Sequence, residues 1–153
     1  MSGSKRILIA DDEETVRSLV KRLLGKTYKI LEAENGEEAV KVAVNEKPDL
    51  ILMDIKMPVM DGIVATKKIR EIESAGDKHI PIIAVTANAL AGDRENCLAA
   101  GADDYFMLKE HVVGVARHGI AEYERDGTDR FMYRAPMIML FHRFLSCALT
   151  HSL

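Results

Sequence analysis

The sequence predicts an α/β fold, in which a parallel sheet is covered by helices on both faces. Short apolar runs and amphipathic segments alternate over the first 110 residues. The apolar runs are too hydrophobic to be half exposed, which is typical of strands in a buried parallel sheet. Such strands are joined by right-handed crossovers, so helices are expected on both faces of the sheet.

Five apolar runs are predicted as strands. Each is short and is followed by polar or turn-forming residues, as expected of a strand that ends at the edge of a sheet. They are RILIA at 6–10, YKILEA at 28–33, DLILMD at 49–54, PIIAVTA at 81–87 and DDYFML at 103–108.

Four segments between these runs are predicted as helices, at 13–25, 35–47, 62–74 and 91–101. In the first, Val16, Leu19 and Val20 begin an apolar stripe with the i, i+3, i+4 spacing of an amphipathic helix. Gly25 is placed to end that helix. Asn35 is the predicted N-cap of the second helix.

Composition and charge argue against several classes of protein. The net charge of −3 over 153 residues gives no support for a general affinity for nucleic acid or for an anionic membrane. Cys97 and Cys147 are isolated and are expected to be buried thiols. The apolar run at 7–10 is too short for a signal peptide, so a cytoplasmic location is expected.

Acidic and hydroxyl side chains follow three of the predicted strands. Asp11 and Asp12 follow the first strand, Asp54 ends the third, and Thr86 lies at the end of the fourth. In a parallel sheet these ends share one edge, where ligands bind beside a topological switch point. Carboxylates gathered there repel one another unless a cation neutralises them, and Mg²⁺ (or Mn²⁺) suits such oxygen ligands. An aspartate beside the ion can attack phosphorus and form an aspartyl phosphate.

Each of these residues also has a simpler interpretation. The acids at 11–14 are often only a solvated helix start, and Glu13 and Glu14 are interpreted in that way. Thr86 alone would be an ordinary strand residue. The joint occurrence of acids after the first and third strands and a hydroxyl after the fourth favours a site.

Three motifs and their spacing resemble the receiver domain of two-component response regulators. They are ILIADDE at 7–13, LILMDIKMPVMDG at 50–62 and PIIAVTANALAGDRENCLAAGADDY at 81–105. The resemblance predicts a receiver domain over 5–110 with a flavodoxin-like, doubly wound fold of five parallel strands in the order 2-1-3-4-5. The last motif is most like receivers attached to hybrid histidine kinases.

The resemblance also implies a role for each site residue. Asp54 would be the phosphoacceptor. Thr86 would bind the new phosphate through its hydroxyl, and Tyr105 would be the aromatic switch that turns inward when Thr86 moves. Asp12 would be a direct ligand of the Mg²⁺ ion, and Asp11 would help through water or share the ion. Asp54 and the backbone carbonyl of Lys56 would be the other protein ligands.

The function implied is signal transduction by phosphorelay. A histidine kinase or a histidine phosphotransfer protein would donate the phosphoryl group from a phosphohistidine to Asp54, which would switch a protein-interaction surface. The chain would turn over no external substrate and would not be an enzyme. A homodimer is also compatible with the resemblance, through the face from the fourth helix to the fifth strand or through the tail.

The sequence departs from the family pattern after the fifth strand. The family has a lysine followed by proline three residues after the switch tyrosine, and that lysine pairs with the phosphate. Here Leu108 stands in that position. Lys109 comes one residue later, and Glu110 replaces the proline. Because side chains alternate along a strand, Lys109 would face the wrong way unless a bulge inserts one residue. The alternative function is therefore an interaction module whose switch is impaired.

The tail at 111–153 differs in composition from the preceding 110 residues. It has five arginines and no lysine, and Gly114 and Gly119 interrupt a potential helix. One hypothesis is a degenerate fifth helix followed by an extra helix from Pro136 on. The other is an out-of-frame or truncated end of a receiver gene.

A phosphohydrolase with an aspartyl-phosphate intermediate is a third function considered. Such enzymes generally need a second aspartate two residues after the nucleophile, and that position here is Lys56. The sequence also has no GxxxxGK[ST] loop that would bind a nucleotide.

Overall fold

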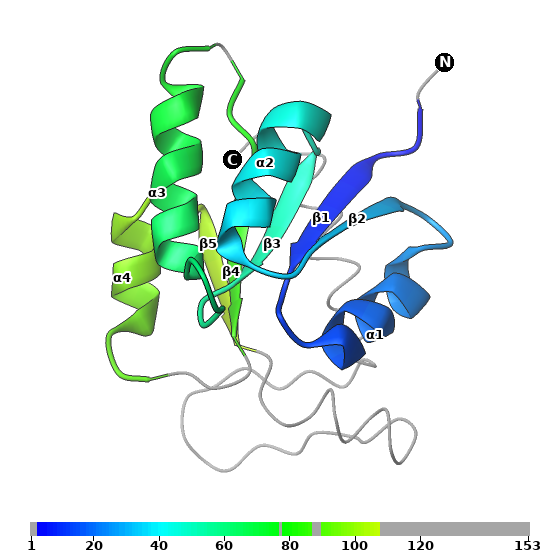
Figure 1. The fold of residues 1–153 in the computed structure, drawn as a ribbon, viewed down its shortest axis with the longest axis horizontal. Coiled ribbons are helices and arrows are strands. Elements are labelled where there is room, and N and C mark those ends of the chain that lie inside the picture. The colour runs from blue at the N-terminus through cyan, green and yellow to red at the C-terminus, as the bar shows by residue number, and fades with distance from the viewer. Residues whose placement is uncertain (1–2, 77, 87–89, 108–153) are drawn as a thin grey trace, which may run out of the picture.

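A five-stranded parallel sheet forms the centre of the protein in the computed structural model, which describes residues 3–76, 78–86 and 90–107 (Figure 1). The strands are β1 Arg6–Ala10, β2 Lys29–Ala33, β3 Leu50–Asp54, β4 Ile82–Thr86 and β5 Asp104–Met107. The helices are α1 Glu14–Leu24, α2 Gly36–Glu46, α3 Gly62–Glu73 and α4 Asp93–Ala99. Each element lies within a segment predicted from the sequence.

The strand order is β2-β1-β3-β4-β5, as the resemblance implied. β1 pairs with β2 on one side and with β3 on the other, and Leu8 lies opposite both Leu31 and Ile51. The chain therefore leaves β1 in one direction across the sheet and later returns past it in the other. This reversal places the topological switch point between the carboxyl ends of β1 and β3, where parallel α/β sheets bind ligands.

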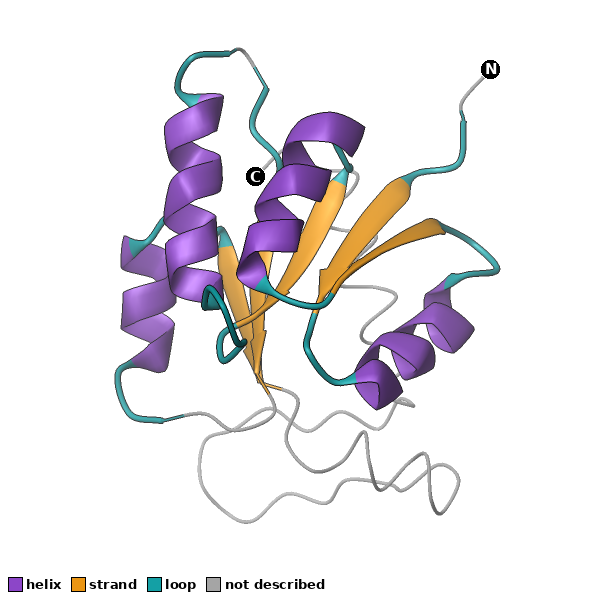
Figure 2. Ribbon diagram, in the orientation of Figure 1, coloured by secondary structure: helices purple, strands orange, loops and turns teal. Residues whose placement is uncertain are grey.

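Helices cover both faces of the sheet (Figure 2). On one face, α1 packs through Val20 and Leu24 against Ile7, Ile9 and other strand residues. On the other face, α2 and α3 lie side by side and contribute four residues to the hydrophobic core, which are Ala39, Ala43, Ala65 and Ile69. In a separate small cluster, the α4 residue Cys97 packs against Ala84 of β4 and Tyr105 of β5. The alternating residues of each inner strand are thus buried from both sides.

The expectation that no strand is half exposed was wrong for the edge strands β2 and β5. In β2, Lys29 and Glu32 are exposed and only Ala33 is buried, and no residue of β5 is buried. β2 is the edge strand next to β1, so it lacks a second neighbour and its charged side chains can reach water.

Side-chain caps determine where two of the helices begin. The Asn35 side chain accepts a hydrogen bond from the Glu38 amide at 2.9 Å, which confirms it as the N-cap of α2. Asp61 caps α3 in the same way through the Val64 amide, also at 2.9 Å. Glu13 occupies the N-cap position of α1 without a side-chain cap bond.

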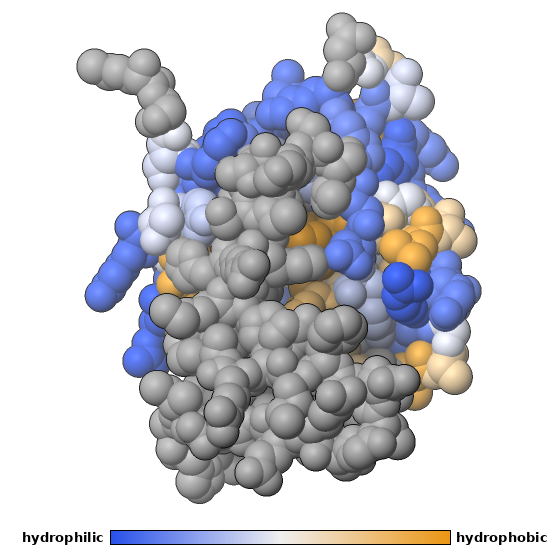
Figure 3. All heavy atoms as spheres, turned by 180° about the vertical axis from the view of Figure 1, so that it is seen from behind, coloured by the Kyte–Doolittle hydropathy of each residue, from blue (hydrophilic) through white to orange (hydrophobic). Residues whose placement is uncertain are grey.

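The visible surface in Figure 3 is largely hydrophilic over the described residues, with smaller hydrophobic patches. In this part of the chain no helix has the length and hydrophobicity to cross a bilayer. Cys97 is buried, as expected for an isolated thiol. Several sequence predictions concern residues outside the described ranges, namely Leu108, Lys109, Glu110, Cys147 and the tail at 111–153.

Candidate functional site

Three carboxylates meet at the carboxyl-terminal edge of the sheet. Asp11 and Asp12 follow β1, and Asp54 is the last residue of β3. One carboxylate oxygen from each lies within 4.8 Å of the others. β1 and β3 are paired neighbours, so the sheet itself brings these groups together at the switch point.

Asp54 is held rigidly and partly shielded from water. Its Oδ1 accepts a hydrogen bond from the Ile55 amide at 2.8 Å, and the Lys56 amide also donates to this carboxylate. Burial, followed by the nearby negative charge of Asp11, raises the pKa of Asp54 to about 7, although the two amides oppose the shift. Without a cation, the Asp54 carboxyl group is therefore partly protonated near neutral pH.

Asp11 is fixed through its backbone and its side chain. Its amide donates to the Ala33 carbonyl of β2 at 3.1 Å, and its Oδ1 accepts from the Glu13 amide at 2.8 Å. Burial raises the pKa of Asp11 to about 6, and the Asp12 charge adds to the shift while the Glu13 amide opposes it. Asp12 itself is exposed. The pair thus offers one ordered and one accessible carboxylate.

The loop after Asp54 is pinned at several points. The Gly62 amide donates to the Ile55 carbonyl at 2.8 Å, and the Gly36 amide donates to the Met60 carbonyl at 2.9 Å. The Met60 amide also donates to the Pro58 carbonyl at 2.7 Å across Val59, whose φ is 67°. This is a γ-turn with a positive φ, which is costly for a β-branched residue. The loop carries Lys56, whose side chain is exposed, past the carboxylates.

Thr86 and Tyr105 lie on the neighbouring strands β4 and β5, and β4 pairs with the strand that ends in Asp54. Asp54 pairs with Val85, so Thr86 is one residue farther along β4, where it is only 4% exposed. Tyr105 pairs with Ala84 and packs with it against α4. Because side chains alternate along a strand, Ala84 and Thr86 point to the same face of the sheet. Thr86 therefore lies on the same face of the sheet as the Tyr105 ring, which is the face covered by α4.

The donor set fits a hard divalent cation. Carboxylate oxygens are the ligands that Mg²⁺ and Mn²⁺ prefer. The pKa values of Asp11 and Asp54 are raised mainly by burial and further by neighbouring carboxylates, and a bound cation would favour their ionised forms. Within the ranges described above, this is the one such group of three acidic, histidine or cysteine side chains. Lys109, for which the sequence left open whether it reaches the phosphate, lies outside those ranges.

Arg17 is a residue near the site that the sequence interpretation missed. It is only 7% exposed, and its Nη1 donates to the Asp11 carbonyl at 2.8 Å. An arginine on an amphipathic helix is usually assigned to the solvent-facing side. The signal available was its spacing, because Arg17, Val20 and Leu24 are i, i+3 and i+7 and form the buried stripe of α1.

Comparisons with known proteins agree with this geometry. The family model described as "Response regulator receiver domain" matches residues 7–111. Hybrid signal transduction histidine kinase G of Dictyostelium discoideum is 47% identical over 121 residues, which are 74% of this chain but only 4% of that protein. The chain therefore spans a very small part of that relative.

Two receiver domains are among the solved structures that share the fold. The receiver domain of sensor histidine kinase PA1611 from Pseudomonas aeruginosa has a TM-score of 0.63 and 38% identity, covering 75% of this chain and 93% of that one. That structure has a magnesium ion coordinated in its active-site cleft. The Saccharomyces cerevisiae Ssk1 receiver domain, in complex with the histidine phosphotransfer protein Ypd1, has a TM-score of 0.62 and 28% identity, covering 76% and 88%.

The fold, the acidic edge of the sheet and the family match over most of the chain lead to one assignment. The chain belongs to the response regulator receiver domain family of two-component signal transduction.

Proposed function

We propose that this receiver accepts a phosphoryl group on Asp54 from a phosphohistidine of a partner protein. The observation that carries the proposal is the cluster of Asp11, Asp12 and Asp54, with carboxylate oxygens within 4.8 Å of one another at the switch point. β3 delivers Asp54 to this cluster on a rigid, buried element, which suits a nucleophile that must be aligned with phosphorus.

In the transfer, an Asp54 carboxylate oxygen forms a bond to phosphorus as the bond between phosphorus and the partner's imidazole nitrogen breaks. The imidazole keeps that electron pair and takes up a proton. Asp54 must be ionised to attack, whereas burial and Asp11 raise its pKa to about 7. A cation bound to the cluster would therefore favour the ionised, reactive form of Asp54.

The residues proposed to hold the cation are Asp11, Asp12, Asp54 and the backbone carbonyl of Lys56. A bound Mg²⁺ or Mn²⁺ would supply positive charge that stabilises the phosphoryl oxygens during transfer. Asp11 and Asp54 contribute partly buried carboxylates, and Asp12 contributes an exposed one that can exchange between water and the ion.

Thr86 and Tyr105 are proposed to convert the phosphoryl group into a changed surface. The Thr86 hydroxyl would bind the phosphate, and the Tyr105 ring, which packs against α4, would turn inward as Thr86 moves. Leu90 and Met107 expose 54% and 40% of their surface next to α4 and β5. A protein partner or a second copy of the chain would bind to this surface, and the switch would change that binding.

The proposed donor is a histidine kinase or a histidine phosphotransfer protein in the cytoplasm. The Ypd1–Ssk1 complex supports this, because a receiver of the same fold is bound there to a phosphotransfer protein. The receiver would turn over no external substrate, and Lys56 stands where aspartyl-phosphate hydrolases need a second aspartate.

A second function is favoured by the sequence after β5. Leu108 stands where the family has its phosphate-binding lysine, and Lys109 is displaced by one residue. If Lys109 does not reach the phosphate, the chain would keep the receiver fold as an interaction module with an impaired switch.

Incubation with phosphoramidate and Mg²⁺, followed by intact-protein mass spectrometry, separates these functions. Phosphotransfer predicts an adduct of about 80 Da, the mass of one added HPO₃. The adduct should be absent from Asp54→Ala and present in Asp61→Asn, which alters an acid in the same loop outside the cluster. No adduct on the wild-type chain would overturn the phosphotransfer function and support the interaction module.

A further inference from the structure

We propose that Arg17 is a positioning residue that holds the Asp11 backbone in the conformation required for cation binding. This inference rests on the proposed function, because it assigns Arg17 a part in the same metal site. Arg17 is not itself a metal ligand, and it would act only through Asp11 and the neighbouring Asp12.

Arg17 is held between the acidic loop and the edge strand. It lies about one turn into α1, at the end of the helix nearest the site, and its side chain is 8% exposed. Nη1 donates to the Asp11 carbonyl oxygen at 2.8 Å. A charged donor makes this hydrogen bond stronger than one between neutral groups.

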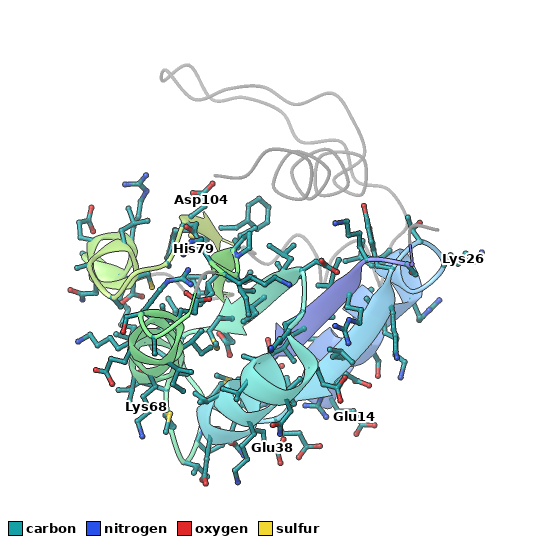
Figure 4. The ribbon with its side chains drawn as sticks, turned by 90° about the horizontal axis from the view of Figure 1, so that it is seen from above. Glu14, Lys26, Glu38, Lys68, His79 and Asp104 are labelled. Carbon is teal, nitrogen blue, oxygen red and sulfur yellow. The ribbon has the colours of Figure 1, made fainter. Side chains whose placement is uncertain are left out.

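The other guanidinium nitrogens contact the carboxylates of Glu32, which lies in β2, and Glu34, which follows β2. Nη2 donates to Glu34 Oε1 at 3.2 Å, and Nε lies 3.7 Å from Glu32 Oε1. Arg17 and these two carboxylates line a charged groove. Glu14 and Glu38, both labelled in Figure 4, line it as well. The two carboxylates thus hold the planar guanidinium through Nε and Nη2, and its third nitrogen, Nη1, donates to Asp11.

This contact completes the restraint on Asp11. The Asp11 amide already donates to Ala33 on β2, and its side chain accepts from the Glu13 amide. Arg17 restrains the carbonyl, which is the start of the peptide that leads to Asp12. Loss of that hydrogen bond would free this peptide to rotate and would move both carboxylates relative to Asp54. Residues that orient metal ligands in this way typically contribute a factor of about 10 to 100 in metal affinity.

The sign of the effect separates positioning from electrostatics. The positive charge of Arg17 lowers the pKa of Asp11 and also repels a cation in the adjacent cluster. At a pH well above that pKa, where Asp11 is ionised in any case, only the repulsion remains, so removal of Arg17 would strengthen Mg²⁺ binding if charge alone mattered. A positioning role predicts the opposite, that removal weakens Mg²⁺ binding despite the more favourable charge.

The test is the Mg²⁺ affinity of the whole chain, measured by isothermal titration calorimetry and checked by Mn²⁺ binding in electron paramagnetic resonance. Arg17→Gln should bind Mg²⁺ about 10-fold more weakly than the wild type. Arg17→Lys keeps the charge but lacks the planar fork, so its affinity should lie between the two. Lys21→Gln is the matched control, because it removes one positive charge from the same helix, where Lys21 pairs with Glu32 at 3.0 Å. Its affinity should stay within about two-fold of the wild type.

Circular dichroism establishes that each variant is folded before titration. Unchanged or tighter Mg²⁺ binding by Arg17→Gln overturns the inference and leaves the proposed function intact. If Arg17→Gln does not fold, Arg17→Lys decides, and wild-type affinity in that variant overturns the inference. An equal loss in Lys21→Gln would also overturn it. Absence of Mg²⁺ binding by the wild type would instead overturn the proposed metal site, and this inference with it.

Discussion

A side chain at Gly62 would collide with the backbone carbonyl of Asp54. The first residue of α3 lies directly against the end of β3, where an added Cβ would overlap the Asp54 oxygen and also approach its carbonyl carbon at 2.9 Å. The chain makes this close return because the Gly62 amide donates to the Ile55 carbonyl. Glycine at 62 thus lets α3 begin against the residue that is proposed to be phosphorylated.

Replacing Gly62 with alanine should destabilise the fold. The added methyl group can be accommodated only by moving the backbone of Asp54 or α3, so we expect a loss of about 2–3 kcal/mol in the free energy of unfolding. Gly76→Ala is the control, because its Cβ would be no closer than 3.8 Å to the Glu73 carbonyl. Urea unfolding measures both variants, and equal stabilities would contradict the close approach.

The stability of the metal-free protein should depend on pH through Asp54. Its pKa is raised from 3.8 to about 7 by folding, so the folded state binds the proton more tightly than the unfolded chain. This stabilisation is fully present below pH 3.8 and is lost as pH rises through about 7. Asp54→Asn removes the effect and should be more stable than the wild type at pH 8 by about 1 kcal/mol, after allowance for solvent screening.

Urea unfolding at pH 4 and pH 8 in the presence of EDTA tests this pH dependence. The difference in stability between the wild type and Asp54→Asn should grow from pH 4 to pH 8. A difference that is the same at both values would show that the Asp54 environment does not raise its pKa.

Magnesium should stabilise the protein against heat. A ligand that binds only the folded state at about 100 times its Kd adds about 2.7 kcal/mol to the free energy of unfolding. We expect this gain to be reversed by EDTA and to be largely lost in Asp12→Asn, which removes one of the three clustered carboxylates. Differential scanning calorimetry measures the shift in Tm.

Glu37→Gln is the control for the magnesium measurement. It removes an exposed acid that is not a member of the cluster and whose partner is Lys41 at 3.2 Å. A similar loss of the Mg²⁺ effect in this variant would indicate a general response to charge and not a specific site.

Truncation of Asn35 should weaken α2. Its side chain satisfies the Glu38 amide at 2.9 Å, so Asn35→Ala should cost about 1 kcal/mol. Glu13→Ala alters the equivalent position of α1, where no side-chain cap bond is made, and should cost under about 0.5 kcal/mol. Chemical denaturation that ranks the two variants in the opposite order would refute the assigned cap.

The sequence by itself determined the elements and the residues at their ends. Apolar runs such as 50–54 predict buried strands, and Asn35 predicts a helix start, because both signals are local in the chain. The meeting of Asp11, Asp12 and Asp54 could also be predicted, since parallel strands deliver their carboxyl ends to one edge. The motifs then supplied the strand order through resemblance to a family.

Tertiary structure alone decided which side chains lose water and what surrounds them. Arg17 is buried because β2 and the Asp11 loop close over it, and Lys29 and Glu32 are exposed because β2 has no second neighbour. The raised pKa of Asp54 depends on burial by several elements and on the charge of Asp11 from another strand. Periodicity in a sequence records which face of an element is apolar, whereas burial and electrostatic environment depend on segments that are distant in the chain and adjacent only after folding.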